Sequence, residues 1–418
     1  MNQSGKNQAI RDAIRATRLK RKNQTCKTFK FKIDKSSLSQ SQKESLEMFF
    51  IESKRIYNYI IGSEMDPFNI GYKDVKEITY LDKNKNSIKY KIQYIGSSII
   101  DETIVTMRDS IKGLSVLKKK GYDVGGLKFK SEYNSIRLRQ YGVTHSIRGN
   151  RFKIQGIKKP IRVNGLNQLE KYKNIEYTVA RLLYDGYDYY ISLVCFIDKE
   201  KHNNSKRSII GIDLGCESTI TLSNGEKKKI SIEESKRLKG LQAKLATQKK
   251  RSNNWYKTKS LIKKEYNRIV NQKNDISNKI VHEIVSNYEI IIIQDDQINE
   301  WHEDSNTSKI VHHSIIGRIK NKLKGYDNVI VLDQWFPTSQ HCFECGTNTK
   351  HNVSKRTFIC SKCGSKSDRD IHAANNMIKY YMSIQSAGTV DLKSGRKISY
   401  TSCKNLFKQE AQLSLATE

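Results

Sequence analysis

The chain has 418 residues, of which 37% are hydrophobic, so it is long enough for two or three domains that each bury a core. It contains no run of about 18 apolar residues, and its N-terminus is polar and basic, so we expect neither a transmembrane helix nor a secretory signal. Its 76 Lys and Arg residues against 43 Asp and Glu give a net charge of +33. This charge favours a nucleic-acid partner, because Lys and Arg side chains that contact phosphates release the counterions bound there. The alternatives are a protein that binds a membrane surface and a ribosomal type of protein.

The first half of the chain is predicted to be a β-barrel interrupted by helices. Alternating apolar and polar residues at 28–33, and again between 125 and 198, predict strands. Between these strands, apolar residues at helical spacing predict helices at about 40–61 and 97–119. The polar segment 66–95 is predicted to be loop with a short helix.

Basic residues stand among aromatic ones in the first half and are frequent along a helical stretch of the second. This combination suits phosphates and stacked bases, although a solvated protein surface is the alternative. The helical stretch, residues 232–287, is expected to lie along a nucleic-acid duplex, with a solvated helix pair as the alternative. The basic residues that we expect to contact nucleic acid on these grounds are Lys128, Lys130, Arg137, Arg139, Lys249, Lys250 and Arg251.

The second half opens with an apolar strand at 208–215 that carries one acid, Asp213. The chain then reaches a hairpin turn predicted at Asn224-Gly225. A hairpin meander whose first strand presents an aspartate is typical of RNase H-like nucleases, in which the strand holds the carboxylate rigidly and Gly211 leaves space beside it. Sugar-kinase and actin-like domains, which bind phosphate, begin in a similar way.

Two further elements carry acids at their ends. Four isoleucines at 290–293 predict a buried strand, which Asp295 and Asp296 follow, although ordinary strand-end polarity is the alternative. Later, Asp368 and Asp370 stand at the predicted start of a helix, where an Ala-Ala pair permits close packing and the helix dipole favours an anion.

Four of the eight cysteines form two C-x-x-C pairs, each followed by glycine, with 14 residues between the pairs. This spacing predicts a zinc ribbon, in which four thiolates hold one structural Zn²⁺. The other four cysteines are scattered, which indicates a reducing compartment rather than a disulfide framework. The predicted zinc ligands are Cys342, Cys345, Cys360 and Cys363.

Acids on three separate elements together indicate two-metal phosphodiester cleavage. Two Mg²⁺ ions about 3.5–4 Å apart activate water and stabilise the leaving oxygen, and they prefer oxygen ligands. The predicted catalytic residues and Mg²⁺ ligands are Asp213, Asp296 and Asp370, with Asp295 and Asp368 as alternates.

Taken in order, these motifs resemble the TnpB proteins of insertion sequences and the compact type V CRISPR effectors. The resemblance covers about residues 205–385 well and the first half loosely. The stretches that carry it are Gly211-Ile212-Asp213-Leu214-Gly215, Asp296-Gln297-Ile298, Thr338-Ser339-Gln340 before the cysteines, Asp368-Arg369-Asp370 with Ala373, Ala374 and Asn376, and, in the first half, Arg55, Tyr57, Asn58 and the Lys128 to Lys130 region. Arg55, Tyr57 and Asn58 are therefore added to the expected nucleic-acid contacts.

The resemblance implies a protein that binds a guide RNA, reads a short flanking motif on duplex DNA, and cuts the DNA that pairs with the guide at one RuvC-like site. It implies catalytic roles for Asp213 and Asp370. The middle acid of the family is usually Glu, so Asp296 is a departure that shortens the side chain. A second departure is His372, which stands where the family commonly has Asn and which we expect to orient rather than to bind metal.

Three functions fit these residues. The first is an active RNA-guided DNA endonuclease, the second is a nuclease-deficient RNA-guided repressor, and the third is a guide-independent resolvase or transposase. We expect a protein of the prokaryotic cytoplasm, as a monomer or as a dimer on RNA. The expected fold is multidomain α+β and α/β: a flexible basic arm (1–26), a wedge β-barrel (27–198) with a helical recognition insert (about 40–120), a linker (199–207), RuvC-like segments I and II (208–337) with a helical insert (232–287), a zinc ribbon (338–366), RuvC-like segment III (367–385) and a tail (386–418).

Overall fold

The computed structural model describes residues 3–82, 84, 86–198, 208–302, 305–350, 355–386 and 397–398. The chain divides into two compact units, residues 1–200 and 201–418. The predicted linker at 199–207 and nearly all of the predicted tail lie outside the described residues. Within the described part of the chain, no helix is both long enough and apolar enough to cross a membrane.

The first unit is built on a seven-stranded sheet in the order β4-β8-β9-β1-β7-β6-β5. Its longest pairing runs from Gln24 opposite Asp198 to Lys32 opposite Tyr190. The two outer strands, β4 and β5, meet through Tyr141, which forms a backbone bridge with His145 of β5 and stacks on Tyr177 of β8 at a centroid distance of 4.9 Å, so the sheet curves back on itself. The predicted β-barrel therefore corresponds to this nearly closed sheet. Its strands are β1 (Gln24–Ile33), β4 (Ser135–Leu138), β5 (His145–Arg148), β6 (Arg151–Ile154), β7 (Ile161–Asn164), β8 (Glu176–Tyr184) and β9 (Tyr189–Asp198).

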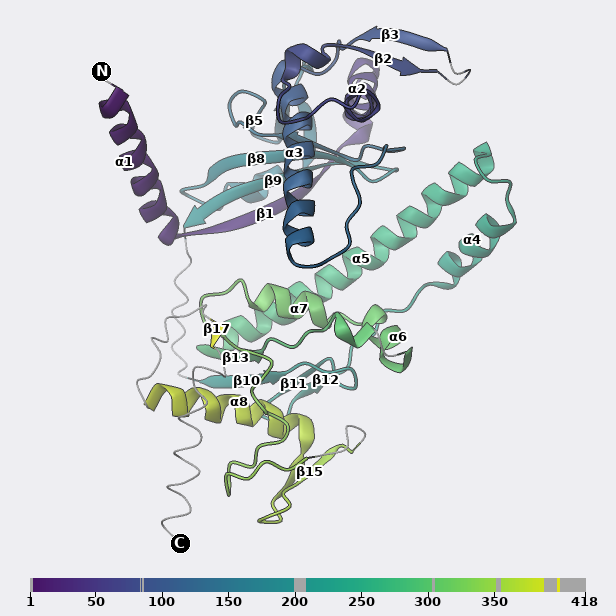
Figure 1. Ribbon diagram of the computed structural model, residues 1–418. Helices are drawn as coiled ribbons and strands as arrows, with labels where there is room; N and C mark the ends of the chain where they lie inside the picture. Colours follow the sequence, from purple (N-terminus) through teal and green to yellow (C-terminus); the bar gives the residue numbers. More distant parts are fainter. Residues whose placement is uncertain are drawn as a thin grey trace. The chain divides into compact units, whose positions relative to one another are not determined.

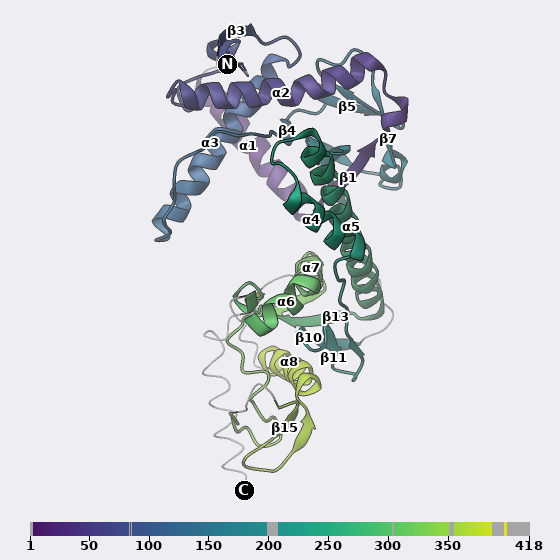
Figure 2. The ribbon, with the colours of Figure 1, turned by 90° about the vertical axis from the view of Figure 1, so that its right-hand side faces the viewer.

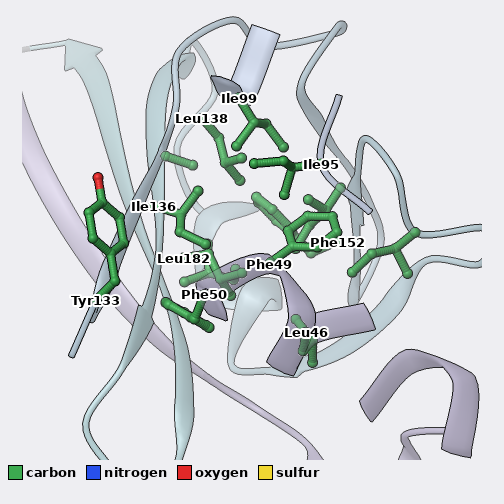
Figure 3. Packing of buried hydrophobic residues seen from close by; sticks show 14 of the residues in the cluster. Leu46, Phe49, Phe50, Ile95, Ile99, Tyr133, Ile136, Leu138, Phe152 and Leu182 are labelled. Carbon is green, nitrogen blue, oxygen red and sulfur yellow. The ribbon is translucent and has the colours of Figure 1, made fainter. Parts of the chain in front are cut away.

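Two long helices, α2 (Gln40–Gly62) and α3 (Ser97–Lys119), pack on the sheet of the first unit (Figure 1). Helix α2 begins at a capping box, in which the Gln42 N–H donates to Ser39 Oγ and the Ser39 N–H donates to Gln42 Oε1. The core between helices and sheet is shown in Figure 3 and includes Phe49, Ile99 and Phe152, all fully buried. The short 3₁₀ turns of this unit are η1 (Lys35–Ser37), η2 (Tyr72–Val75) and η3 (Leu166–Leu169).

Two segments of the first unit contain elements that were not predicted from the sequence. The polar segment between the long helices contains a hairpin, β2 (Glu77–Leu81) and β3 (Ser87–Lys91), rather than loop and helix alone. The basic arm predicted at 1–26 contains helix α1 (Gln3–Lys22), whose Ala, Arg and Lys residues favour helix. Arg21 holds the end of this helix, because its guanidinium lies 3.6 Å from the centroid of the Phe196 ring.

The second unit contains a six-stranded sheet in the order β12-β11-β10-β13-β14-β17. Strands β10, β13, β14 and β17 are parallel neighbours, while β11 and β12 pair antiparallel at the edge beside β10. Both faces are covered: Ile291 and Ile293 pack with α5 (Asn253–Asn287) and α7 (Ile316–Leu323), and Ile292 packs with α8 (Arg369–Ser386). Such strands read as continuous apolar runs, as the four isoleucines do. The strands are β10 (Ile209–Asp213), β11 (Ile220–Leu222), β12 (Lys227–Lys228), β13 (Ile290–Gln294), β14 (Val329–Leu332) and β17 (Lys397–Ile398).

The predicted helical stretch of the second unit is a pair, α4 (Lys236–Thr247) and α5 (Asn253–Asn287), lying side by side (Figure 2). Arg251, in the turn between them, has a positive φ of 67°, a backbone conformation that few residues other than glycine adopt. The remaining elements of this unit are η4 (Glu300–His302), α6 (Ser305–His313), α7 (Ile316–Leu323), β15 (Thr357–Ile359), β16 (Lys366–Asp368) and α8 (Arg369–Ser386).

Candidate active site and metal centre

Three of the predicted acids line one cavity of about 590 Å³ in the second unit. Asp213 is the last residue of β10, Asp296 follows the end of β13, and Asp370 lies in the first turn of α8. The alternates Asp295 and Asp368 do not line this cavity. The fold therefore brings together one acid from each of the three predicted elements.

Asp213 and Asp370 come together because α8 packs directly on β10. A Cβ atom added to Gly211 would lie 1.9 Å from the backbone oxygen of Ala374, which is closer than any real contact. Ala373 and Ala374 are themselves almost completely buried. Only glycine on the strand and a small residue on the helix permit this approach, as the sequence predicts.

Asp368 caps the helix that carries Asp370. Its Oδ1 accepts hydrogen bonds from the backbone N–H groups of Asp370 and Ile371, both at 3.1 Å, and from Lys227 Nζ at 2.8 Å. Although desolvation raises the pKa of Asp368, these bonds outweigh it and hold the pKa below its ordinary value. Asp368 thus serves the helix start, and Asp370 faces the cavity.

Two lysines, one on α7 and one directly after it, bind the side chain of Asp295 but not that of Asp296. Lys320 Nζ lies 2.8 Å from Asp295 Oδ1, and Lys324 pairs with the same oxygen. Lys320 is 8% exposed and also donates to the backbone oxygen of Asp296. Asp295 is therefore neutralised by lysines, and the loop is fixed with Asp296 in the cavity wall.

The electrostatics of the cavity favour a bound cation. Burial first, and then the nearby charges of Asp370 and Asp296, raise the pKa of Asp213 to about 7. Burial also raises the pKa of Asp296; Lys320 opposes this shift and Asp295 adds to it. Carboxylates that destabilise one another in this way form the kind of oxygen-rich site that Mg²⁺ prefers, so the residues present fit a divalent cation.

Other charged residues, which were not predicted from the sequence, line the same cavity. Glu217 and Glu300 each stand four residues after a predicted acid, a spacing that could have drawn attention to them. Arg356 and Arg369 also line the cavity, and Arg369 Nη2 lies 3.3 Å from Asp370 Oδ1. Acids beside arginines are suited to a phosphate group held by metal and guanidinium together.

The four cysteines of the predicted zinc ribbon meet at one point. Their sulfur atoms all lie within 4.8 Å of one another, and the cluster could hold a metal ion. Cys342 Sγ lies 3.7 Å from Cys363 Sγ, and Cys345 Sγ lies 3.4 Å from Cys360 Sγ. A tetrahedral Zn²⁺ with bonds of about 2.3 Å would separate sulfurs by about 3.8 Å, so the spacing fits zinc.

The two knuckles have the same construction. The Gly346 N–H donates to the Cys342 oxygen at 2.7 Å, and the Gly364 N–H donates to the Cys360 oxygen at 3.1 Å. Both glycines have positive φ, of 68° and 72°, which explains why glycine follows each pair. The backbone N–H of Cys363 is the largest of several groups that lower the pKa of Cys360, to about 6, and this favours the thiolate that a metal binds.

Two of the nucleic-acid contacts expected in the first unit have a structural role. Tyr57 is 3% exposed and lies in the hydrophobic core, because the helix face that carries it packs on the sheet. The Asn58 side chain bonds both backbone groups of Lys130, donating to its oxygen at 2.9 Å and accepting from its N–H at 2.8 Å. Tyr57 is therefore enclosed by the core, whereas Asn58 also lines a second cavity of this unit.

Arg55 and Lys130 line a second cavity, of about 940 Å³, within the first unit. Arg55 stacks over Tyr80 and Tyr90 at 4.0 and 4.6 Å, and Lys130 lies 4.0 Å from the centroid of the Tyr57 ring. Burial lowers the pKa of Lys130. These cations rest on aromatic rings of the protein itself while bordering the cavity.

The remaining expected contacts divide into paired and exposed residues. Arg137 Nη1 lies 3.1 Å from Asp109 and its Nε 3.3 Å from Glu102, so it joins β4 to α3. Arg139 lies 3.5 Å from Glu102 with its side chain 66% exposed. The exposed positions without such a structural role are Lys128 and the turn residues Lys249, Lys250 and Arg251.

Two family models match the chain. One, described as "Cas12f1-like, TNB domain", matches residues 312–377, which include the cysteine cluster and Asp370. The other, described as "Probable transposase" (OrfB_IS605), matches residues 192–300, which include Asp213 and Asp296.

Two curated proteins are similar in sequence. A Streptomyces pristinaespiralis protein named "Putative RNA-guided DNA endonuclease" is 26% identical over 238 residues, which are 54% of this chain and 58% of that protein. An Escherichia coli K12 protein named "Putative RNA-guided DNA endonuclease InsQ" is 27% identical over 239 residues, 50% of this chain and 58% of that protein. The match thus spans less than two thirds of each relative.

A solved structure entitled "Cryo-EM structure of the Cas12f1-sgRNA-target DNA complex" contains a chain that is 14% identical, with a TM-score of 0.41 and coverage of 81% of both chains. At that TM-score the likeness carries no argument about this chain.

Proposed function

We propose that this chain, whose predicted resemblance to the TnpB-like effectors is confirmed by both family models and both curated relatives, is an RNA-guided DNA endonuclease. The observation that carries the chemistry is the presence of Asp213, Asp296 and Asp370 around one cavity. The proposal of an RNA guide and a DNA substrate is based on the names of the two curated relatives. These names do not favour the nuclease-deficient alternative.

The second unit is proposed to be an RNase H-like, RuvC-type nuclease. Its support is the order of the sheet: an antiparallel β10-β11-β12 meander is followed by parallel β13 and β14, and α8 crosses the face of β10. In this assignment β10, β13 and α8 are the three catalytic segments, and α4 and α5 are the helical insert.

The three acids would hold Mg²⁺ at the cavity. When bound, such ions neutralise the phosphodiester, activate a water and stabilise the leaving oxygen. The chain itself supplies the fixed carboxylates, and Arg356 and Arg369 add positive charge for the DNA backbone. The four cysteines are proposed to bind one structural Zn²⁺, since a site with four sulfur ligands leaves no open position for a substrate.

Guide RNA and target DNA are the proposed partners of the basic surfaces. The exposed Lys249, Lys250 and Arg251 are the proposed backbone contacts of the α4–α5 turn. Changing all three to Gln should reduce the dependence of RNA or DNA affinity on salt by a slope of about 2–3, because each lost phosphate contact removes about 0.7–0.9. An unchanged slope would remove this turn from the interface.

The function is tested with the full-length chain and the RNA that co-purifies with it. We expect Mg²⁺-dependent cutting of a DNA that matches the guide and carries a randomised flank, and sequencing of the cut molecules should return a short preferred motif. Absence of cutting with every guide and flank would contradict the proposal. Cutting of branched DNA without RNA would instead support the resolvase alternative.

A further inference from the structure

The turn at residues 337–341 connects β14 to the first cysteine knuckle. Its backbone is closed on itself, because the N–H groups of Gln340 and His341 both donate to the Pro337 oxygen at 3.0 Å. Thr338 is 5% exposed, and it lines the same cavity as the three acids. The turn contains the Thr-Ser-Gln motif but no carboxylate, so the proposed chemistry alone does not explain it.

The strand that leads to Asp296 is hydrogen-bonded to this turn through Gln294. Gln294 is 7% exposed, and its Nε2 donates to the backbone oxygens of Phe336 at 2.7 Å and Asp333 at 3.2 Å. Its Oε1 accepts a hydrogen bond from the Thr338 hydroxyl at 2.7 Å. The last residue of β13 is thus held from both sides of its amide, two positions before Asp296.

The helix that carries Asp370 is hydrogen-bonded to the same turn through Asn376. Asn376 is 1% exposed, and its Nδ2 donates to the backbone oxygens of Thr338 at 2.6 Å and His341 at 2.8 Å. His372 Nε2 also lies 2.8 Å from the His341 oxygen. Both contacts come from the face of α8 that is buried against the turn.

Thr338 is therefore bonded to both acid-bearing elements, through its hydroxyl on one side and its carbonyl on the other. We propose that Thr338 is a positioning residue, which fixes the strand of Asp296 and the helix of Asp370 against one turn and so sets the separation of the two carboxylates. This inference rests on the proposed function. It explains why Thr338, Gln294 and Asn376, all uncharged and buried, accompany the acids.

The hydroxyl can be removed without changing the shape of the side chain. Thr338→Val leaves the Gln294 oxygen without its buried donor, whereas Thr338→Ser retains the donor. Removing a group that orients metal ligands typically costs about 10–100-fold in metal affinity or activity. Thr258→Val is the matched control, because Thr258 is a buried threonine of α5 that does not line the cavity.

The experiment measures Mn²⁺ binding to the full-length chain by electron paramagnetic resonance, together with the Mg²⁺ concentration that gives half-maximal cutting. We expect Thr338→Val to weaken Mn²⁺ binding and to raise the Mg²⁺ requirement, each by about 10-fold. Thr338→Ser should stay near the wild type, as should Thr258→Val. Zinc content should be the same in all four proteins.

A Thr338→Val protein that melts at a lower temperature but binds Mn²⁺ like the wild type would show a merely structural role and overturn the proposal. If Thr338→Val loses its zinc, the same Mn²⁺ titration is carried out on Gln294→Met, which removes the side-chain hydrogen bonds between β13 and the turn. A wild type that binds Mn²⁺ without cutting contradicts the proposed activity alone. A wild type that binds no Mn²⁺ at this cavity overturns both proposals.

Discussion

The cysteine cluster and the acid-lined cavity are both candidate metal sites of the second unit, but the chain assembles them in different ways. The thiols come from two knuckles that are each closed within a few residues by the same backbone hydrogen bonds. The acids come from β10, β13 and α8, which meet only through tertiary packing. Among the described residues, the four thiols are the one group of three or more metal-binding side chains that meets so closely.

This difference teaches where each site is vulnerable. A local site depends on its ligands and on the glycines beside them. A site built from distant elements depends also on residues that never touch the metal, such as Gly211 under α8 and Lys320 beside Asp295. The acid site should therefore respond to changes at several supporting positions to which the cysteine site is insensitive.

The largest expected effect is the loss of one acid. Asp370→Asn should lower DNA cutting by about 10³-fold or more, since groups that act as a unit in catalysis are not replaced by their neighbours. Guide RNA and DNA binding should remain, because the fold keeps its cap at Asp368. Single-turnover cutting and a filter-binding assay measure the two properties, and Asp275→Asn on the exposed face of α5 is the control. Full cutting by Asp370→Asn would remove this acid from the mechanism.

Sequence alone predicted a large part of both sites. The spacing of the cysteines and the glycine after each pair determine the turn that brings two thiols together, so each half of the cluster can be predicted from a short stretch of chain. The acids were predicted because each ends an apolar strand or begins a helix. Which acid of each pair lines the cavity depends on contacts that the local sequence does not show: Lys320 and Lys324 bind Asp295, and the start of α8 binds Asp368.

The first unit marks the limit of such predictions. A tyrosine beside a basic residue resembles a binding motif, but the Tyr57 side chain lies in the core. Asn58, next to it, both bonds the backbone of Lys130 and lines a cavity, so its expected role stays a prediction. The hairpin β2–β3 was missed because each strand has only five residues and most of them are exposed. Burial and side-chain pairing decide these cases, and neither is visible in local sequence.

The second prediction tests whether the cysteine site supports the acid site. Cys360→Ser should unfold the ribbon, since structural zinc supplies much of the folding free energy of small zinc domains. The Phe358 ring stacks on the His372 ring of α8 at 3.8 Å, so we expect cutting to fall as well, by about 10–100-fold. Hydrogen exchange should lose protection in β15 and β16 and keep it in β13. Normal cutting without zinc would separate the two sites completely.

The third prediction concerns the contact of α8 with β10. Gly211→Ala places a methyl group against the Ala374 oxygen, and such overpacking costs about 1–3 kcal/mol. The melting temperature should fall by about 2–4 °C per kcal/mol, with a loss of cutting and no loss of zinc. Gly240→Ala on α4 is the matched control, because open space surrounds it and the helix should gain about 0.5–1 kcal/mol. Equal melting temperatures for the two variants would contradict the packing argument.

The smallest expected effect is at Asp296. Asp296→Glu restores the length that the resemblance leads one to expect and moves the carboxylate outward by one methylene group. Lys320 holds the backbone oxygen at this position, not the side chain, so the loop should stay in place and cutting should change by less than about 10-fold. Cutting measured against Mg²⁺ concentration distinguishes a change in metal binding from a change in rate. A loss of about 10²-fold, the cost of a ~1 Å misplacement, would mean that this cavity is built for the shorter acid. A large gain in cutting would mean that the shorter aspartate side chain limits the activity of the wild type, and that one methylene group accounts for the difference.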